Sequence, residues 1–437
     1  MRIGPNSGCL SKFACIFLAM AVKSITRDIQ YYKFCLYGFF KNLRFFDAFL
    51  VLFLLEKGIG YFEIGLLYGI REIVIMIIEI PSGFIADAMG RRKTLISSFF
   101  FYILSFLFFY LSTGIALVFV AMILFAIGDA FRTGVHKAMI FHYLKVNGWA
   151  DQKVDYYGHT RSWSQAGSAF SALTAGIIVF FTGEISSVFI WSVIPYLLDM
   201  ALIYSYPTWL DGELKHGHLP KMKTAFAEVW KAFVQSLKTP VTRRALLSTS
   251  LFSGYYSAIK DYIQPVIKAV AVSTPVLVWL DNEQRTAVLI GVIYFFIYLL
   301  TSLASRLSGR INQLFVHPYK PVNLTLAAGF ALGAVTFTFY YMGIYSIPIL
   351  GFLLIMMIEN LRKPMGIALV AEYSQNASMA SVLSVSSQAK SLLAALLASV
   401  TGLLAEWLGL GSALVMVSVF LLMLYPFYQL KRKGNTR

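Results

Sequence analysis

Long apolar stretches recur along this chain, each about as long as a bilayer is thick, and they limit what it can fold into. Of the 437 residues, 58% are hydrophobic, and the mean hydropathy is +0.70. A membrane-spanning helix needs roughly 20 mostly apolar residues, and lipid leaves peptide groups no partners outside a helix. We therefore predict twelve spanning helices, near residues 36–55, 62–85, 94–112, 114–140, 161–182, 185–204, 245–268, 286–305, 322–341, 346–369, 380–402 and 410–428.

The positive charge of the chain is distributed in a way that predicts its topology. The formal net charge is +16, and Lys and Arg gather after the second, fourth, sixth and eighth spans and at the C-terminus. The other loops carry little beyond Lys57 and Arg285. This positive-inside pattern predicts a multi-pass protein of the inner (plasma) membrane with both termini in the cytoplasm. The charge thus sets topology, and no nucleic-acid partner is expected.

The longest polar stretch divides the chain into halves of six spans each. We predict an N-terminal cytoplasmic extension (1–35), a first bundle (36–205), a cytoplasmic linker (206–244), a second bundle (245–430) and a cytoplasmic tail (431–437). Apolar residues at helical spacing in the linker, from Phe226 to Leu237, predict an amphipathic helix. It either lies on the inner leaflet or connects the bundles from beneath. The apolar run 13–22 resembles a signal-peptide core, so retention of residues 1–30 stays open.

The two halves repeat each other. Asp129 and Arg132 recur as Glu359 and Arg362, 230 positions further on, and both pairs lie inside apolar stretches. Two weaker matches, of span one with span seven and of span five with span eleven, follow in the same order; the first aligns Arg44 with Lys260. Because six is even, both halves enter the membrane in the same direction. The predicted fold is an all-α membrane protein of twelve helices, in two six-helix bundles related as parallel pseudo-twofold repeats.

The loop between spans two and three resembles the signature loop of the major facilitator superfamily. It reads Gly83-Phe-Ile-Ala-Asp87-Ala-Met-Gly90-Arg91-Arg92-Lys93, with Ala88 where the family has a basic residue; the second half keeps only Gly309-Arg310. The resemblance covers nearly the whole chain. It implies that Gly83, Asp87, Gly90 and Arg91 form a conformational latch, and that spans one, four, seven and ten line a central cavity. The family's glycine-proline antiport motif is absent from span five, which weakens a drug-efflux interpretation.

Charged residues inside these spans are the candidate functional groups, because burying them in a membrane is costly. A simpler interpretation exists for Asp129–Arg132 and Glu359–Arg362. In each pair, the acid and the arginine have i, i+3 spacing within one helix and could neutralise each other as an ion pair. Lys260 lies beside Asp261, but neighbouring helical residues point about 100° apart. Lys390 has no acid within one turn and must find a partner elsewhere. The candidate substrate contacts are Arg44, Arg132, Arg161, Lys260, Arg362, Lys390, Tyr255 and Tyr256.

Other polar residues are interpreted as structural. Glu72 and Glu79 of span two are expected to face span eleven or the latch. His136 and His142, at the inner membrane boundary, are expected to be solvated. No metal-ligand cluster, cofactor motif or nucleophile–base pair emerges, so an enzyme is not expected.

The surplus of cations predicts a secondary active transporter for a small anionic or zwitterionic organic solute, working by alternating access. Asp47, Asp129 and Glu359 are the candidates for proton coupling, since carboxylates can exchange protons when burial and cation pairing change. The expected partners are the solute, a proton or other coupling ion and membrane lipids, and the protein is expected to be a monomer. Two alternatives stay open: a multidrug/proton antiporter, and a non-transporting receptor or scaffold with the same fold.

Overall fold

The computed structural model describes residues 26–212, 238–313, 319–373 and 379–430, together with residues 227, 231, 234, 315 and 317. Within these residues all regular secondary structure is helical. Most of the predicted linker helix and the apolar run 13–22 lie outside the described residues.

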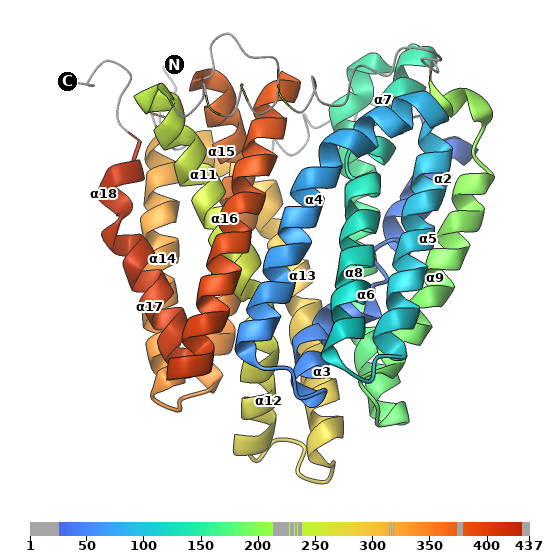
Figure 1. Ribbon diagram of the computed structural model, residues 1–437. Helices are drawn as coiled ribbons and strands as arrows, with labels where there is room; N and C mark the ends of the chain where they lie inside the picture. The colour runs from blue at the N-terminus through green and yellow to red at the C-terminus, as the bar shows by residue number, and fades with distance from the viewer. Residues whose placement is uncertain are drawn as a thin grey trace, which may run out of the picture.

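The helices correspond to the twelve predicted spans, six in each half of the chain (Figure 1). The first half comprises α2 (Ile29–Phe40) with η1 (Phe45–Ala48) and α3 (Leu50–Glu56), α4 (Tyr61–Met89), α5 (Arg91–Tyr110), α6 (Ile115–Arg132) with α7 (Val135–Val146), η2 (Ala150–Gln152), α8 (Lys153–Thr182), α9 (Ser187–Tyr204) and η3 (Thr208–Asp211). The second half comprises α11 (Pro240–Ile259) with η4 (Lys260–Tyr262) and α12 (Ile263–Ser273), α13 (Asn282–Gln313), α14 (Tyr319–Tyr341), α15 (Ser346–Tyr373), α16 (Met379–Leu408), and α17 (Leu410–Met423) with α18 (Tyr425–Tyr428).

Length and apolarity alone identify seven described helical segments that could cross a membrane, among them Arg91–Tyr110, Ile115–Val146 and Asn282–Ser308. Span twelve is apolar but its helix, Leu410–Met423, is shorter; the other remaining spans are interrupted by a break or carry more charged residues, features that often mark a transport pathway.

Spans one and seven are broken at equivalent positions of the repeat. Span one leaves the α-helix after Phe40 and resumes at Leu50, while span seven passes through the short 3-10 helix η4. Irregular backbone at membrane depth is tolerated where protein or a water-filled cavity covers it. The two breaks lie where Arg44 and Lys260 align, so they support the repeat.

The two halves touch along two close helix crossings. A methyl group on Gly65 of α4 would come within 2.6 Å of the Ala398 carbonyl oxygen in α16, and one on Gly176 of α8 within 2.7 Å of the Ala287 oxygen in α13. Small residues allow such close approach of membrane helices. Helices α4 and α16 stand side by side at the front of the molecule (Figure 1).

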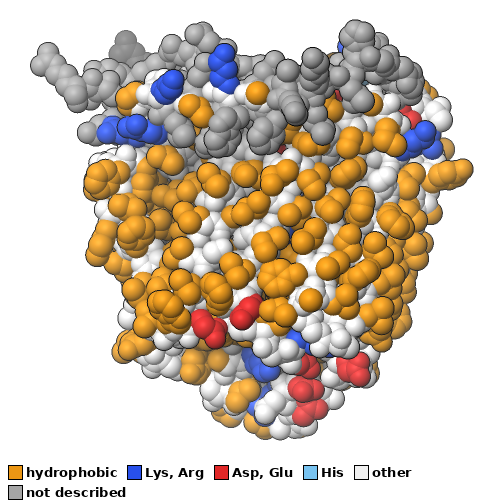
Figure 2. All heavy atoms as spheres, in the orientation of Figure 1, with side chains coloured by type: hydrophobic (Ala, Val, Ile, Leu, Met, Phe, Trp, Pro, Cys, Tyr) orange, Lys and Arg blue, Asp and Glu red, His pale blue; other side chains and the backbone are white. Residues whose placement is uncertain are grey.

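The outer surface fits a lipid environment. Figure 2 shows hydrophobic side chains covering the middle of one face, with Lys and Arg at the upper edge and Asp and Glu near the lower edge. Both ends of the described chain lie at the upper end in Figure 1, which we call the terminal end; the opposite end is the far end.

Candidate functional site

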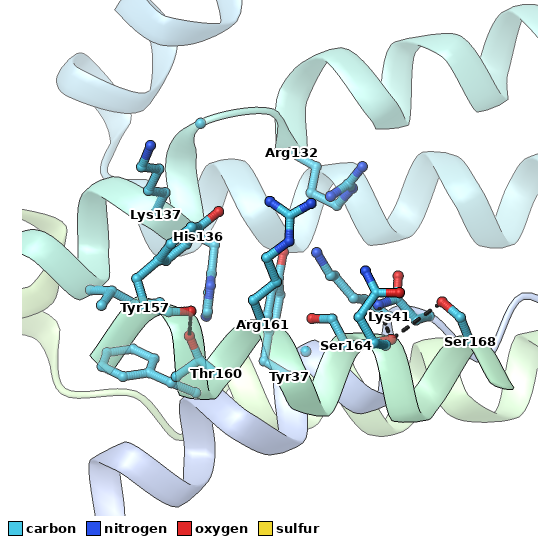
Figure 3. Close-up of a pocket in the computed structure, with 16 residues that line it drawn as sticks. Tyr37, Lys41, Arg132, His136, Lys137, Tyr157, Thr160, Arg161, Ser164 and Ser168 are labelled. Carbon is cyan, nitrogen blue, oxygen red and sulfur yellow. Dashed lines mark hydrogen bonds between the residues drawn. The ribbon is translucent and has the colours of Figure 1, made fainter. Parts of the chain in front are cut away.

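A cavity of about 290 Å³ lies at the terminal end, among α2, α6, α7 and α8. Its basic lining side chains are Lys41, Arg132, His136, Lys137 and Arg161 (Figure 3). The other polar lining residues include Asn42, Thr160, Ser164, Gln165 and Ser168, and none of the carboxylates that the structure describes lines it. We call it the cationic cavity. Like charges gathered in this way repel one another, so an anion would stabilise them.

Local structure explains how these side chains meet. Arg161, Ser164, Gln165 and Ser168 have the i, i+3, i+4, i+7 spacing of one helix face on α8. On the opposite wall, Gly134 adopts φ +80°, a left-handed conformation that a glycine accepts without strain. This turn ends α6 after Arg132 and starts α7, so it carries His136 and Lys137 to the same cavity.

Two smaller cavities continue the path toward the middle of the protein. The central cavity, about 200 Å³, is lined by Asp47, Lys260 and Asp261 together with Tyr256, Tyr294, Tyr298 and Asn360. A third cavity of about 60 Å³ lies beside Arg44 and Asp47. Ser168 lines all three cavities, so they are neighbours between the terminal end and mid-depth, and we refer to the three together as the route.

Asp129 holds two arginines at once. Its Oδ1 lies 3.1 Å from Nη2 of Arg44 and 2.9 Å from Nη2 of Arg132, and Tyr102 donates its hydroxyl hydrogen to the same oxygen. Arg44 also donates from Nε to the Tyr196 hydroxyl at 2.8 Å. The expected i, i+3 pair is therefore present, but one carboxylate serves two guanidinium groups. The network keeps a net positive charge.

The second half departs from the expected pairing. The Glu359 Oε1 accepts a hydrogen bond from Ser253 at 2.6 Å, while its Oε2 is buried without a partner. Arg362 is only 2% exposed and donates from Nη2 to the Ser248 carbonyl oxygen at 3.0 Å; its Nε and Nη1 have no hydrogen-bond partner. The i, i+3 interpretation is wrong for this pair. The side chains turn to α11 instead.

Two lysines have partners that spacing alone did not predict. Lys260 Nζ lies 2.7 Å from Asp261 Oδ1, because η4 replaces the α-helical geometry that would keep neighbours apart. Lys390 Nζ lies 3.8 Å from Glu72 Oε2, across the crossing of α16 and α4. Glu72 also accepts from Ser391, and Glu79 from Ser387, so both glutamates face span eleven as expected. Neither lysine is a free cation in this conformation.

The two candidate tyrosines have different surroundings. Tyr256 lines the central cavity. Tyr255 is fully buried, and its hydroxyl lies 2.7 Å from Ser418 Oγ of α17. We therefore no longer include Tyr255 among the proposed substrate contacts, because it packs within the second half.

The structure brings forward three residues that were not among the expected substrate contacts or coupling sites. His136 is not solvated: its ring stacks on Tyr37 with centroids 3.6 Å apart, and its Nε2 lies 3.3 Å from the Tyr206 hydroxyl. Lys41 lines the cationic cavity and forms no ion pair with a described carboxylate. Gln264 is fully buried at the break in span one. Lys41 lies one turn before Arg44, and His136 one turn after Arg132, so helical spacing could have indicated both.

Gln264 closes the far side of the route. Its Oε1 accepts from the backbone N of Val51 at 2.8 Å and of Leu52 at 3.3 Å, and its Nε2 donates to the Asp47 carbonyl oxygen at 2.9 Å. These are the peptide groups that the break in span one leaves without helical partners. Beyond Gln264, a cavity of about 530 Å³ lined by Phe49, Leu52 and Pro265 faces the far end. The amide thus bridges the two halves between two cavities.

In the part of the chain that the structure describes, no hydrogen bond or ion pair joins the signature loop to the second half. Asp87 is exposed, and a methyl group on Gly83 would find nothing within 4 Å. Gly90 adopts φ +99° between α4 and α5, where the Asp211 side chain lies close and accepts from the Arg92 backbone N at 2.7 Å. Arg91 reaches toward the Ala138 carbonyl oxygen. Gln264 thus joins the two halves on the far side of the route, whereas Gly83 and Asp87 are exposed at the terminal end. Within the described residues, no group of His, Cys, Asp or Glu could hold a metal ion.

Comparison with known proteins identifies the family. A model described as the Major Facilitator Superfamily matches residues 33–398. The chain is 24% identical over 407 residues to YxaM, an uncharacterized MFS-type transporter of Bacillus subtilis (strain 168), covering 89% of this chain and 92% of the relative.

Solved structures share the fold. A mutant of the nucleoside transporter NupG superimposes with a TM-score of 0.69 at 12% identity, over 91% of this chain and 97% of that one. A POT family transporter in complex with a thioalcohol-conjugated peptide gives 0.68 at 13% identity, over 91% and 94%.

The fold and the route through it define a multi-pass membrane transporter. The chain belongs to the major facilitator superfamily, a family of secondary transporters and not of enzymes.

Proposed function

We propose that this protein moves a small anionic or zwitterionic organic solute across the inner membrane by alternating access, coupled to protons, and that both of its termini are cytoplasmic. The observation that carries the proposal is the cationic cavity. Four Lys and Arg side chains and a histidine line it, and no carboxylate is among its described lining residues. Arginine offers two parallel hydrogen bonds to a carboxylate or phosphate, which favours an anionic group on the solute.

The central cavity supports the zwitterionic option. The Asp47 side chain forms no hydrogen bond or ion pair with any described residue and lines both inner cavities. A solute that spans from the cationic cavity toward Asp47 can place an anionic group at one end and an ammonium group at the other. An apolar cavity with one or two acids, as expected for multidrug efflux, is not what this route offers.

Among the three candidate coupling carboxylates, Asp47 and Glu359 remain the better supported. Asp129 accepts from two arginines and a tyrosine, so adding a proton there would displace several contacts. Glu359 has one unpartnered oxygen on which a proton can reside without displacing a hydrogen bond. We propose these two residues as the coupling sites of the central route.

Binding and flux experiments test the substrate class. A thermal-shift screen of the purified protein over carboxylates, phosphates, amino acids and small peptides selects the solutes, and uptake into proteoliposomes follows. We expect Arg161→Gln to weaken binding of the selected anion by roughly tenfold, the scale of a lost charge-assisted hydrogen bond. Lys93→Gln, at an exposed lysine outside the cavity, is the matched control. Equal affinity for every anion in the two variants would remove the substrate proposal.

Topology has its own test. A fluorescent reporter fused after residue 437 is expected to be active in the cytoplasm, and an alkaline phosphatase fusion in the 274–281 loop of the far end to be active outside it. The reverse pattern would contradict the positive-inside prediction.

A further inference from the structure

Asp199 of α9 is a buried carboxylate for which neither the packing nor the proposed route gives a role. It is 0% exposed, and both of its oxygens lack a hydrogen-bond partner. Burial of such a group without partners is costly when it is ionised and less so when it carries a proton. Asp199 should therefore carry a proton unless a cation comes close to it.

Helix register places Asp199 next to Lys41. On α9, Tyr196, Asp199, Ile203 and then Tyr206 share one buried face by their spacing. The Tyr196 hydroxyl donates to the Lys41 carbonyl oxygen at 3.1 Å, and the Tyr206 hydroxyl to the Lys33 carbonyl oxygen at 3.3 Å. The two helices thus run antiparallel, and Asp199 lies opposite the α2 turn that precedes Lys41.

The charges around Asp199 point the same way. Lys41 and Arg132 are the charged side chains that interact with it electrostatically, and both line the cationic cavity. Arg132 is already held by Asp129 at 2.9 Å, whereas the Lys41 ammonium forms no ion pair with a described carboxylate. Lys41 is thus the cation that Asp199 can capture. Titratable and charged groups reach this region from every element packed against it: Tyr37 of α2 and Lys41 just after it, Arg44 and Asp47 at the break in span one, Tyr102 of α5, Arg132 of α6, His136 of α7, Arg161 of α8, Tyr196 of α9 and Tyr206 after α9.

We propose that Asp199 is a proton-controlled switch for the cationic cavity and acts through Lys41. With a proton on Asp199, the Lys41 ammonium is available to an anion in the cavity. When that proton leaves to water at the terminal end, the carboxylate attracts the Lys41 ammonium into an ion pair and removes one cation from the anion site. Anion and proton then bind together and leave together.

The direction of the linkage follows from this arrangement. Because the anion and ionised Asp199 compete for Lys41, anion affinity is highest at low pH and falls as pH rises. By reciprocity, binding an anion favours protonated Asp199, so binding takes up protons from solution. The inference rests on the proposed anion specificity, but it assigns a separate residue and a separate observable.

Sulfate binding provides the first test, because sulfate does not itself titrate near neutral pH. Calorimetry of the purified full-length protein in two buffers of different ionisation enthalpy measures affinity and proton uptake together. In wild type we expect affinity to fall about tenfold or more across the transition, with proton uptake on binding. In Asp199→Asn, the fall in affinity with rising pH and the proton uptake on binding should both be clearly smaller than in wild type, since only the other titratable lining groups remain; in Lys41→Gln, affinity should be low at every pH.

Matched carboxyl variants distinguish this switch from the coupling sites of the central route. Asp47→Asn and Glu359→Gln should keep the pH dependence of sulfate binding. If Asp199→Asn keeps the wild-type pH profile, or if either of the other two variants abolishes it, the inference is wrong.

Infrared difference spectroscopy tests Asp199 without any solute. A pH step should produce a carboxylic-acid C=O band that is missing in Asp199→Asn and shifted in Lys41→Gln, whose lost ammonium alters the group's surroundings. If the band is present but wild type neither binds nor transports any anion, the proposed substrate class is wrong and only the titration of Asp199 stands. Absence of the band, with anion transport intact, would overturn the switch and leave the transport proposal standing. Should Asp199→Asn fail to fold, the wild-type and Lys41→Gln spectra and binding profiles decide alone, since equal pH profiles in these two would overturn the proposal.

Discussion

The same acid–arginine pattern makes different contacts in the two halves. In the first half, Asp129 binds both Arg132 and Arg44. In the second half, Lys260 is the residue that aligns with Arg44, and it pairs with Asp261 instead. Glu359 then turns to Ser253, and Arg362 is left without a carboxylate. The i, i+3 spacing predicted both pairs equally. Side chains from other helices determine which of the two ion pairs forms, and the spacing within one helix gives no information about those side chains.

Arg362 and Arg132 are therefore expected to respond differently to the same substitution. Arg362→Leu removes a buried charge that forms no ion pair with a described carboxylate, so thermal stability should stay the same or rise. Arg132→Leu takes one of two guanidinium groups away from Asp129, which keeps Arg44, so it should lower stability, but by less than the about 3–5 kcal/mol typical of a buried charge left without a partner. Thermal unfolding of the two purified variants in one detergent measures the difference.

Transport provides the second readout for this pair. If Arg362 meets Glu359 or the solute in another conformation, Arg362→Leu should fold well and yet transport poorly. A large loss of stability in Arg362→Leu, equal to that in Arg132→Leu, would contradict the interpretation that its charge is unsatisfied here.

At the scale of helices, the two broken spans are the features that hydropathy does not reveal. Residues 41–49 of span one contain neither glycine nor proline, so nothing local marks the end of α2. The break is stabilised from outside: Asn42 donates to the Ser164 carbonyl oxygen at 2.7 Å, and Gln264 serves the peptide groups of Val51 and Leu52. The positions of the spans could be predicted from apolarity because the lipid favours apolar residues along the whole length of each span. The breaks depend on single side chains from distant spans.

Gln264→Leu is expected to loosen the far side of the route. The substitution keeps the volume similar but leaves two backbone N–H groups and one carbonyl oxygen buried without partners, each worth about 1–3 kcal/mol. The far-end contact between α3 and α12 should weaken, and the population open to the far side should rise. A cysteine at Ser168, in a background without the native cysteines, reports this through its labelling rate with an impermeant thiol reagent applied from the far side.

Gln165→Leu is the control for this experiment. Gln165 lines the same route but does not bridge the two halves. Labelling from the far side should rise in Gln264→Leu and not in Gln165→Leu. Equal rates in all three proteins would show that Gln264 does not hold the far side closed.

For the whole molecule, the sequence predicted the architecture better than the site. Apolar length, alternate-loop charge and the repeat of Asp129–Arg132 are properties of the chain itself, so the fold class and the family resemblance followed from them and are confirmed. The cationic cavity was not foreseen, because α7 and the terminal half of α8 form much of its wall. Arg132 and Arg161 were among the expected contacts. Asp199 becomes a candidate only when its neighbours are known.

The two ends of the route differ in the way that alternating access requires. At the far end, Gln264 and the crossing at Gly65 hold the halves together, and Glu406 of α16 accepts from the Tyr61 backbone N at 2.8 Å. At the terminal end, Gly83 and Asp87 are exposed and make no contact with the described residues of the second half. A transporter must also visit the opposite arrangement, in which the terminal end closes. The signature loop is the part of α4 that would then meet the second half.

Gly83→Trp is expected to separate folding from transport. A side chain at this position meets nothing within 4 Å in the present conformation, so the variant should fold and unfold near the wild-type temperature and bind anions from the terminal side with wild-type affinity. The same bulk would block close packing when the terminal end closes, and uptake into proteoliposomes should be lost. Gly65→Trp is the contrast, because even a methyl group there comes within 2.6 Å of a backbone oxygen, and this variant should not fold stably. If Gly83→Trp transports at the wild-type rate, the loop does not approach the second half during the cycle, and its role as a latch is excluded.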